Sequence, residues 1–307
     1  MTIEPALRHP DTRSPTKGMV FARHETFHPR FGWLKKGFDR VAHDPKVFLR
    51  EDAPVRLGVG KNMVRSIRYW CTAFKLLQDD QPTEFGQQLL GSQGWDPYLE
   101  DPASLWLLHW TLLEAPHLAT AWNITFNEFR AVEFTVEELF YQLCEYRDRH
   151  APRISDSSLK KDVSCLLRMY VPQPGGKAHV SEESLDCPFT QLGLIHTAGD
   201  ARHYKFRIGQ KPNLPPELVV YACLQHHAQV GSSAKTMPIA NLLYDPGSPG
   251  SVFKLTESVL CDAIEVVARR CEKIRLSDAA GKLQFSIEGE PLSLAGAILD
   301  GYYRAGR

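Results

Sequence analysis

The chain has 307 residues, and its 36 lysine and arginine residues balance its 36 aspartate and glutamate residues, so the formal net charge is zero. The composition is typical of a globular protein, and the length allows two or three domains. Because the net charge is zero, total charge gives no reason to expect binding to polyanions. The seven cysteines include no C-x-x-C pair, which argues against a zinc ribbon and fits a reducing cytosol. No apolar run approaches the roughly 20 residues that span a bilayer, so we expect a cytoplasmic protein that does not associate with membranes.

The N-terminal stretch, residues 1–18, is polar and lacks the apolar core of a signal peptide, so we expect a disordered tail. A basic block follows, because residues 23–75 contain 12 Lys and Arg against 5 Asp and Glu. Residues 79–148 contain 13 acidic and 2 basic residues, and residues 149–177 contain 6 basic and 2 acidic residues. Such blocks can leave basic surfaces on a neutral molecule, although each could also be an ordinary solvated face.

The first block contains FARHETFHPRFGWLKKGFDRV, in which histidine, glutamate and lysine are mixed with aromatic residues. Histidine and glutamate can hold a metal or act as a base, and lysine can stabilise a phosphate charge. We therefore predict His24, Glu25, Lys35 and Lys36 as catalytic residues. Two alternatives stay open: a basic, aromatic nucleic-acid surface that includes Arg30, or a helix anchored by its aromatic side chains.

The stretch GVGK, Gly58 to Lys61, raises the possibility of a phosphate-binding P-loop. That motif requires G-x-x-x-x-G-K-[ST], but Asn62 follows the lysine and Val55 stands at the first glycine position. We therefore interpret the two glycines as a tight turn that leads into a helix.

The helix after this turn has two opposite faces. Apolar residues, including Trp70 and Phe74, recur at three- and four-residue steps and predict a core-facing stripe. A cationic stripe is shifted by two positions, about 200° around the helix. Such a helix is typical of helix-turn-helix units that contact DNA, although a solubilising surface helix is the alternative. The predicted DNA contacts in this region are Arg30, Lys61, Asn62, Arg65, Arg68 and Lys75.

The acidic segment WDPYLED precedes the apolar helix pattern PASLWLLHWTLL. Its carboxylates could bind Mg²⁺ or Mn²⁺ beside a phosphate. We therefore predict Asp96 and Asp101 of this segment as metal ligands, together with Glu25 of the basic block. The alternative is that the acids cap the helix and interact with its dipole. We place Trp106 and Trp110 in the core.

Two further segments repeat the helix-turn-helix pattern. In the first, Thr135 and Glu138 form a predicted capping box, and a following helix carries the predicted DNA contacts Lys160, Lys161 and Arg168. The second is a helix at Thr256–Arg270 followed by a hairpin-like wing. The predicted fold is mainly α (α+β), with tandem winged-helix or helix-turn-helix-like modules and short β-wings. The predicted boundaries are a tail at 1–18 and modules at 19–100, 101–178 and 179–307, with a linker at Val171–His179.

Several blocks between Phe21 and Leu255 carry a family resemblance, among them HETFHPRFGWLKKGFD, VRLGVGKNMVRSIRYW, LLGSQGWDPYLEDPASLWLLHW, SLKKDVSCLLRMYV, SLDCPFTQLGLI and YDPGSPGSVFKL. They resemble a bacterial family, first described as a domain of unknown function, that belongs to DNA phosphorothioation systems. The resemblance implies cytosolic DNA binding and strand nicking in modification and antiviral defence. It also implies a cysteine desulfurase, an ATPase and an ATP-pyrophosphatase-like sulfur-transfer protein as partners.

The sequence patterns predict a DNA-binding protein, and with the nicking that the resemblance implies we expect a metal-dependent DNA endonuclease. Two alternatives remain open: a non-catalytic adaptor that places the sulfur-transfer machinery on DNA, and a transcriptional regulator that binds duplex without cutting it.

Overall fold

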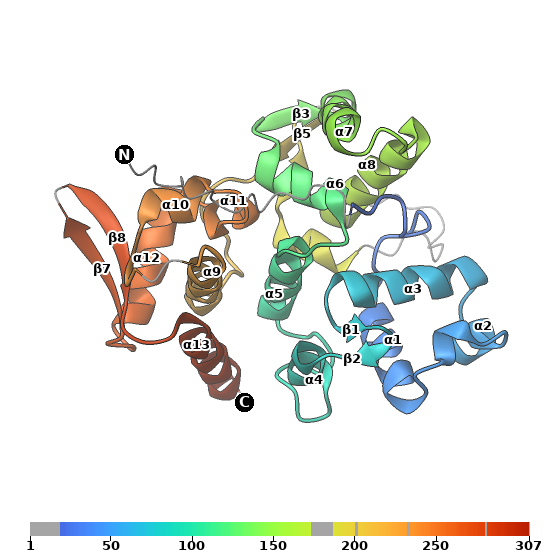
Figure 1. The fold of residues 1–307 in the computed structure, drawn as a ribbon, viewed down its shortest axis with the longest axis horizontal. Coiled ribbons are helices and arrows are strands. Elements are labelled where there is room, and N and C mark those ends of the chain that lie inside the picture. The colour runs from blue at the N-terminus through green and yellow to red at the C-terminus, as the bar shows by residue number, and fades with distance from the viewer. Residues whose placement is uncertain (1–18, 173–186, 200–201, 232–233, 280, 307) are drawn as a thin grey trace, which may run out of the picture.

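The computed structural model in Figure 1 describes residues 19–172, 187–199, 202–231, 234–279 and 281–306. Helices dominate and the three sheets are small and antiparallel, so the predicted mainly α (α+β) class is confirmed. The predicted tail at 1–18 and most of the predicted linker at Val171–His179 lie outside the described residues. None of the described helices has the length and apolar character needed to cross a membrane.

The N-terminal part packs α1 against α3, with a two-stranded hairpin after them. Gly58 ends α2 in the left-handed conformation, with φ of 63°, and Gly60 is the N-cap of α3. The two glycines therefore form the predicted tight turn. The elements are α1 (Trp33–His43), a 3₁₀ turn (Val47–Leu49), α2 (Ala53–Leu57), α3 (Lys61–Ala73), β1 (Leu77–Gln78), β2 (Gln81–Pro82) and α4 (Glu84–Leu90).

The centre of the molecule is α5 (Pro102–Leu113), which lies between the N-terminal and C-terminal elements in Figure 1. Every residue from 103 to 113 is buried, as expected for a helix that is apolar on all sides. The predicted core positions of Trp106 and Trp110 are therefore confirmed. Asp101 caps this helix by accepting a hydrogen bond from the backbone N–H of Ala103.

The middle part builds its sheet in the order β3-β5-β4, with β5 antiparallel to both neighbours. The predicted capping box is present, because Thr135 and Glu138 exchange hydrogen bonds at the start of α7. The elements are α6 (Thr120–Asn123), a π-helical turn (Ile124–Glu128), β3 (Glu133–Thr135), α7 (Val136–His150), α8 (Asp156–Tyr170), a 3₁₀ turn (Pro188–Leu192), β4 (Ile195–Thr197) and β5 (His203–Phe206).

The C-terminal part repeats this arrangement, with the strand order β6-β8-β7. Both sheets place the strand that precedes the helices beside the second strand of the hairpin that follows them. The segment at 244–251 contributes the start of a short helix, because Ser248 caps it at Pro249. The elements are α9 (Pro216–Gln229), β6 (Thr236–Pro238), α10 (Ile239–Tyr244), α11 (Pro249–Phe253), α12 (Glu257–Ala268), β7 (Ile274–Ala279), β8 (Lys282–Ile287) and α13 (Pro291–Ala305).

A buried histidine joins three parts of the fold. His109 on α5 bonds through Nδ1 to the hydroxyl of Tyr170 at 2.7 Å and through Nε2 to the carbonyl oxygen of Val252 at 3.1 Å. A carbonyl can only accept, so Nε2 carries the proton and Nδ1 accepts from the tyrosine. Burial lowers the pKa of His109 to about 3, so the ring is a neutral structural link.

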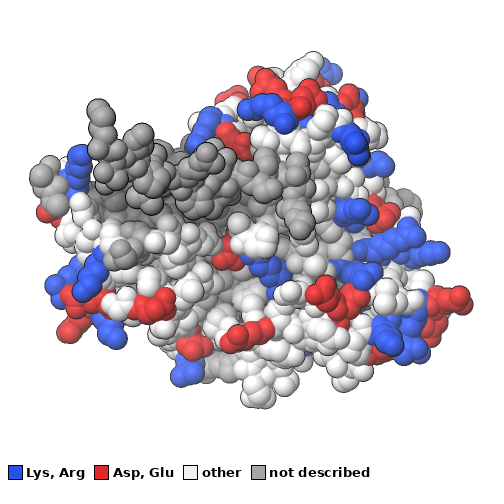
Figure 2. Space-filling model, viewed as in Figure 1, with Lys and Arg blue, Asp and Glu red and all other residues white. Residues whose placement is uncertain are grey.

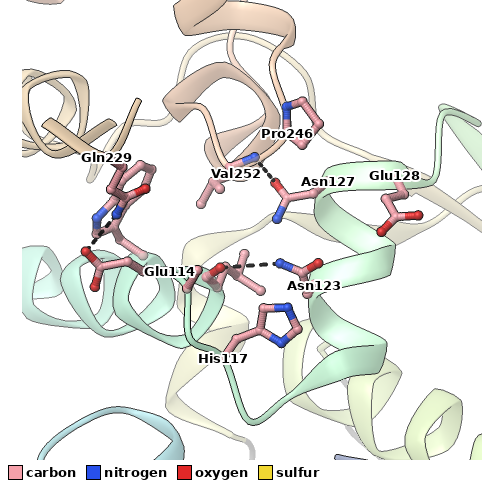
Figure 3. Close-up of a pocket in the computed structure, with 12 residues that line it drawn as sticks. Glu114, His117, Asn123, Asn127, Glu128, Gln229, Pro246 and Val252 are labelled. Carbon is pink, nitrogen blue, oxygen red and sulfur yellow. Dashed lines mark hydrogen bonds between the residues drawn. The ribbon is translucent and has the colours of Figure 1, made fainter. Parts of the chain in front are cut away.

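A cavity of about 200 Å³ lies beside this link, where α5, the π-helical turn and the C-terminal part meet (Figure 3). Some of its polar side chains connect these parts. Glu114 accepts from Gln229 at 2.9 Å, and Asn127 accepts from the backbone N–H of Gly247 at 3.0 Å. We therefore assign these groups to the contact between the middle and C-terminal parts.

The lysine that ends α11 gives a test of this contact. Lys254 donates to the carbonyl of Phe126 at 2.8 Å and lies 4.5 Å from the ring centre of Phe206. Burial lowers the pKa of Lys254 from 10.5 to about 7, so between these values the unfolded chain binds more protons than the folded one. Stability attributable to this residue should therefore rise with pH above about 7, by up to about 1.4 kcal/mol per pH unit.

We expect the free energy of unfolding of Lys254→Met to rise less between pH 7 and pH 8.5 than that of the unchanged protein. Urea denaturation at several pH values measures the two slopes. Parallel profiles would contradict the burial of an uncharged lysine at this position.

Candidate nucleic-acid interface

The cationic face of α3 is exposed, as its sequence predicts. Lys61, Asn62, Arg65 and Arg68 are all solvent-exposed. The opposite face is in the core, where Trp70 and Phe74 are completely buried. The predicted core positions of both aromatic residues are thereby confirmed, and α3 presents one polar face to solvent.

The charges on this face are not equally free. Arg68 makes a two-point ion pair with Asp80, at 2.8 and 2.7 Å, and Arg65 lies 3.7 Å from the carboxylate of Glu25. Within the described part of the chain, no acidic side chain pairs with Lys61. Lys61 is therefore a more available cation than Arg68 for an external phosphate.

Lys75 does not lie on this face, contrary to the sequence-based expectation. α3 ends at Ala73, and Lys75 has a positive φ of 57° that directs the chain into the β1–β2 hairpin. Its ammonium group pairs with Glu114 at 2.7 Å. The three- and four-residue spacing of cationic residues in the sequence extends beyond the last residue of the helix, so it does not predict the position of Lys75.

The N-terminus of α3 opens into a cavity of about 560 Å³ that is lined in part by Arg30, Lys36 and Gly58–Gly60. Gly60 provides no side-chain cap, and the first turn of α3 contains no acidic residue. The first N–H groups of a helix carry partial positive charge and bind anions readily. Arg30, Lys36 and the start of α3 therefore form a site suited to a phosphate group.

Lys35 has a different environment from its neighbour. Its ammonium group donates to Asp39 at 2.8 Å and to the carbonyl of Leu90 at 3.1 Å. Lys36 makes one bond, to the carbonyl of Leu57 at 3.2 Å, and is exposed. Of the two predicted catalytic lysines, Lys36 is the one that faces the cavity at α3.

A strained loop, residues 22–26, lies between α3 and α8. Ala22, Glu25 and Thr26 have positive φ values of 54°, 50° and 68°. Residues other than glycine rarely adopt this backbone conformation. The loop contacts α3 through the Glu25–Arg65 ion pair. It contacts α8 through Arg168, whose guanidinium donates to the carbonyl of Thr26 at 2.5 Å. Such strain persists only where surrounding contacts hold it.

The main such contact is a buried pair beneath the loop. His24 Nε2 lies 2.7 Å from Asp162 Oδ1 on α8, and His24 Nδ1 accepts from the backbone N–H of Thr26 at 3.1 Å. The backbone N–H of Ala22 also donates to Asp162, at 2.9 Å. Because Nδ1 accepts, Nε2 carries the proton that binds the carboxylate. Both nitrogens of His24 are thus engaged inside the protein, which suits an anchor better than a base or metal ligand.

The exposed face of α8 continues the basic surface. Lys160 and Lys161 are exposed, and Arg168 is half-buried against the loop. In Figure 2, Lys and Arg side chains gather along the right-hand edge, over the region where Figure 1 places α2, α3 and α8. α3, the loop at 22–26 and α8 therefore form a connected surface, which we call the basic tract. It comprises Arg23, Arg30, Lys36, Lys61, Asn62, Arg65, Lys160, Lys161 and Arg168.

The family model for a protein of unknown function, DUF4007, matches residues 21–303 of the chain. The chain belongs to this family. A search of curated proteins found no match. Among solved structures, a magnesium ion-bound crystal structure of SspB superposes with a TM-score of 0.87 at 36% sequence identity, covering 94% of this chain and 89% of SspB. A second SspB crystal structure gives a TM-score of 0.86 at 37% identity with the same coverage. The expected resemblance is confirmed.

The magnesium ion in one SspB structure directs attention to the carboxylates of this DUF4007 chain. Both oxygens of Asp96 accept backbone N–H bonds at 2.9 Å, one from Glu100 and one from Asp101, and Ser104 donates to Asp96 at 2.7 Å. Asp101 caps α5, and Glu25 lies on the loop beside α3. Among residues with described positions, no three His, Cys, Asp or Glu side chains could hold a metal together. Both oxygens of Asp96 and one oxygen of Asp101 thus already accept hydrogen bonds from the protein, and Glu25 lies 3.7 Å from Arg65.

Sequence reasoning missed one residue of this surface and one buried residue beneath it. Arg23 is exposed on the strained loop, and Asp162, 138 positions away from His24 in the sequence, anchors that loop. A buried acid within an otherwise apolar helix face is the available signal, because such a group requires a partner.

The His24–Asp162 pair gives a stability prediction. Burial raises the pKa of Asp162, although the hydrogen bond from His24 opposes that effect. His24→Ala should lower the free energy of unfolding by about 3 kcal/mol, because it leaves a buried carboxylate without its side-chain partner. Asp162→Asn should change it by less than about 1 kcal/mol, because an amide oxygen can accept the same two N–H bonds.

Thermal or urea denaturation tests both variants, with His196→Ala as a control at an exposed histidine of β4. A His24→Ala protein as stable as the control would show that this pair does not anchor the loop.

Proposed function

We propose that this protein binds DNA through the basic tract. The observation that carries the proposal is the anchored loop at 22–26, which joins the exposed cationic faces of α3 and α8. Exposed lysine and arginine side chains and an uncapped helix start are the groups that contact phosphates. The net charge of zero does not oppose this, because much of the acidic charge lies elsewhere or is paired.

We further propose that the middle and C-terminal parts are winged-helix modules. Each begins with a strand, which is followed by helices and then by a hairpin. The second strand of that hairpin pairs with the strand that precedes the helices. In such a unit the helix before the hairpin contacts DNA, which makes α8 and α12 the candidates. Exposed residues of α8 include Lys160 and Lys161, whereas those of α12 include Glu257, Asp262 and Glu265. The middle module is therefore the proposed DNA reader.

The likeness to SspB supports a place in a DNA phosphorothioation system. On this proposal the partners are the expected cysteine desulfurase, ATPase and ATP-pyrophosphatase-like protein. The acidic face of α12, which is less suited to DNA, is available for contacts with proteins.

The finer proposal is that the protein nicks DNA. Glu25 borders the basic tract, because it is held on the strained loop 3.7 Å from Arg65. A carboxylate placed among phosphate-binding cations can take a proton from an attacking water, and the cations can stabilise the charge that develops on the phosphate. His24 would act as a positioning residue for this loop. The pairing of Glu25 with Arg65 also suits the alternative, a non-catalytic adaptor.

The binding proposal predicts the effect of salt. Changing Lys61, Arg65 and Lys161 together to alanine should weaken duplex binding, and the slope of log K against log salt should fall by about 0.9 for each lysine or arginine that had neutralised a phosphate. Gel shifts or fluorescence anisotropy at several salt concentrations measure this slope.

A matched control changes Arg269, Lys273 and Lys282 to alanine, which removes the same charge from exposed positions of the C-terminal part. Equal reductions in affinity for the two triple variants would mean that total charge, not the basic tract, determines binding.

The nicking proposal predicts that Glu25→Gln spares DNA binding and reduces conversion of supercoiled plasmid to open circle by about 100-fold or more. Arg65 is retained, so phosphate affinity should stay the same or rise. The assay contains Mg²⁺ or Mn²⁺, with chelated samples in parallel. Full nicking by Glu25→Gln would remove the residue from the chemistry, and an unchanged protein that binds but never nicks would favour the adaptor.

A further inference from the structure

A groove of about 750 Å³ lies beside the basic tract, between α7, α8 and the β4–β5 hairpin. Its volume is within the range of roughly 300–1,000 Å³ that is usual for ligand pockets. α7 contributes Phe140 and Tyr141, and β5 contributes Tyr204. The side chain of Tyr141 is 66% exposed, which is unusual for a large aromatic residue and leaves its ring free to stack.

Two cations of α8 are among the polar groups that line the groove. Lys160 and Arg168 of α8 both line it, and the Lys160 ammonium lies 5.4 Å from the ring centre of Phe140. Arg168 also binds the carbonyl of Thr26, so the groove begins where the strained loop and the basic tract end. Cations next to stacking surfaces are the combination that proteins use for unpaired nucleotides.

One acid lines the same groove. Glu137 is exposed near the start of α7. A carboxylate can accept hydrogen bonds from the exocyclic amino groups of cytosine, adenine and guanine, a group that thymine lacks. Ser164 and Thr197 add hydroxyl groups that can donate or accept.

We propose that this groove binds an unpaired nucleobase of a DNA strand that lies on the basic tract. The base stacks on Tyr141, with Phe140 and Tyr204 forming the apolar wall, while Lys160 and Arg168 contact the flanking phosphates. This rests on the proposed DNA binding and extends it, because it specifies a strand with a base displaced from the duplex. The two cations favour an anionic occupant over a purely apolar peptide, and the exposed aromatic ring suits a planar base better than the aliphatic acids of an acidic peptide.

The test compares a fully paired duplex with the same duplex carrying one unpaired adenine in a bulge. The protein should bind the bulged duplex more tightly, and Tyr141→Ala should reduce that affinity by about tenfold while leaving the salt slope unchanged, because the variant keeps every cation that binds a phosphate. Tyr141→Phe should retain the affinity, because it keeps the ring. Tyr244→Ala is the matched control, since Tyr244 on α10 is also 66% exposed.

Three results would overturn the groove assignment: equal affinity for the two duplexes, no effect of Tyr141→Ala, or an equal reduction in affinity for both duplexes that Tyr141→Phe fails to restore. The last result would indicate that Tyr141 has a structural role, or that the groove binds a protein segment instead of a base. The triple variant of Lys61, Arg65 and Lys161 distinguishes failure of the groove proposal from failure of the DNA-binding proposal. If that variant weakens binding to both duplexes while Tyr141→Ala has no effect, DNA binding stands and the base-binding groove fails.

Discussion

The hydrogen bond between His24 and Asp162 holds the strained loop at 22–26 in place. It fixes a loop with three positive-φ residues onto α8, and the same loop reaches α3 through Glu25. Without that buried contact, the strained loop would lose the main interaction that stabilises its conformation. The two cationic helix faces would then be separate features, whereas in the folded protein they border one connected surface. A strained loop that is held between such faces is characteristic of functional sites.

Local signals in the sequence predicted the local structure well. The opposite stripes of α3, the capping box at Thr135 and Glu138, and the core positions of Trp70 and Trp106 all depend on residues a few positions apart. Periodicity and capping are properties of one helix, so one sequence is enough to recognise them. The predicted helical class follows from the same signals.

The contacts that the sequence did not predict join residues that are distant along the chain. Lys75 pairs with Glu114, Arg68 pairs with Asp80, and His24 lies buried against Asp162. No local pattern specifies which acid neutralises which base, because folding decides that pairing. The acidic block at 79–148 supplies both Asp80 and Glu114, which explains how a basic stretch of sequence can present only part of its charge to solvent.

The central claim is that α3, the loop at 22–26 and α8 act together as one DNA surface. Hydrogen–deuterium exchange of the full chain, with and without a DNA duplex, tests it most directly, because it reports each segment separately. The account predicts slower exchange at 22–26, at the start of α3 and along α8, with little change in α12 or α13. Protection confined to the C-terminal elements, or protection of α3 without α8, would contradict it.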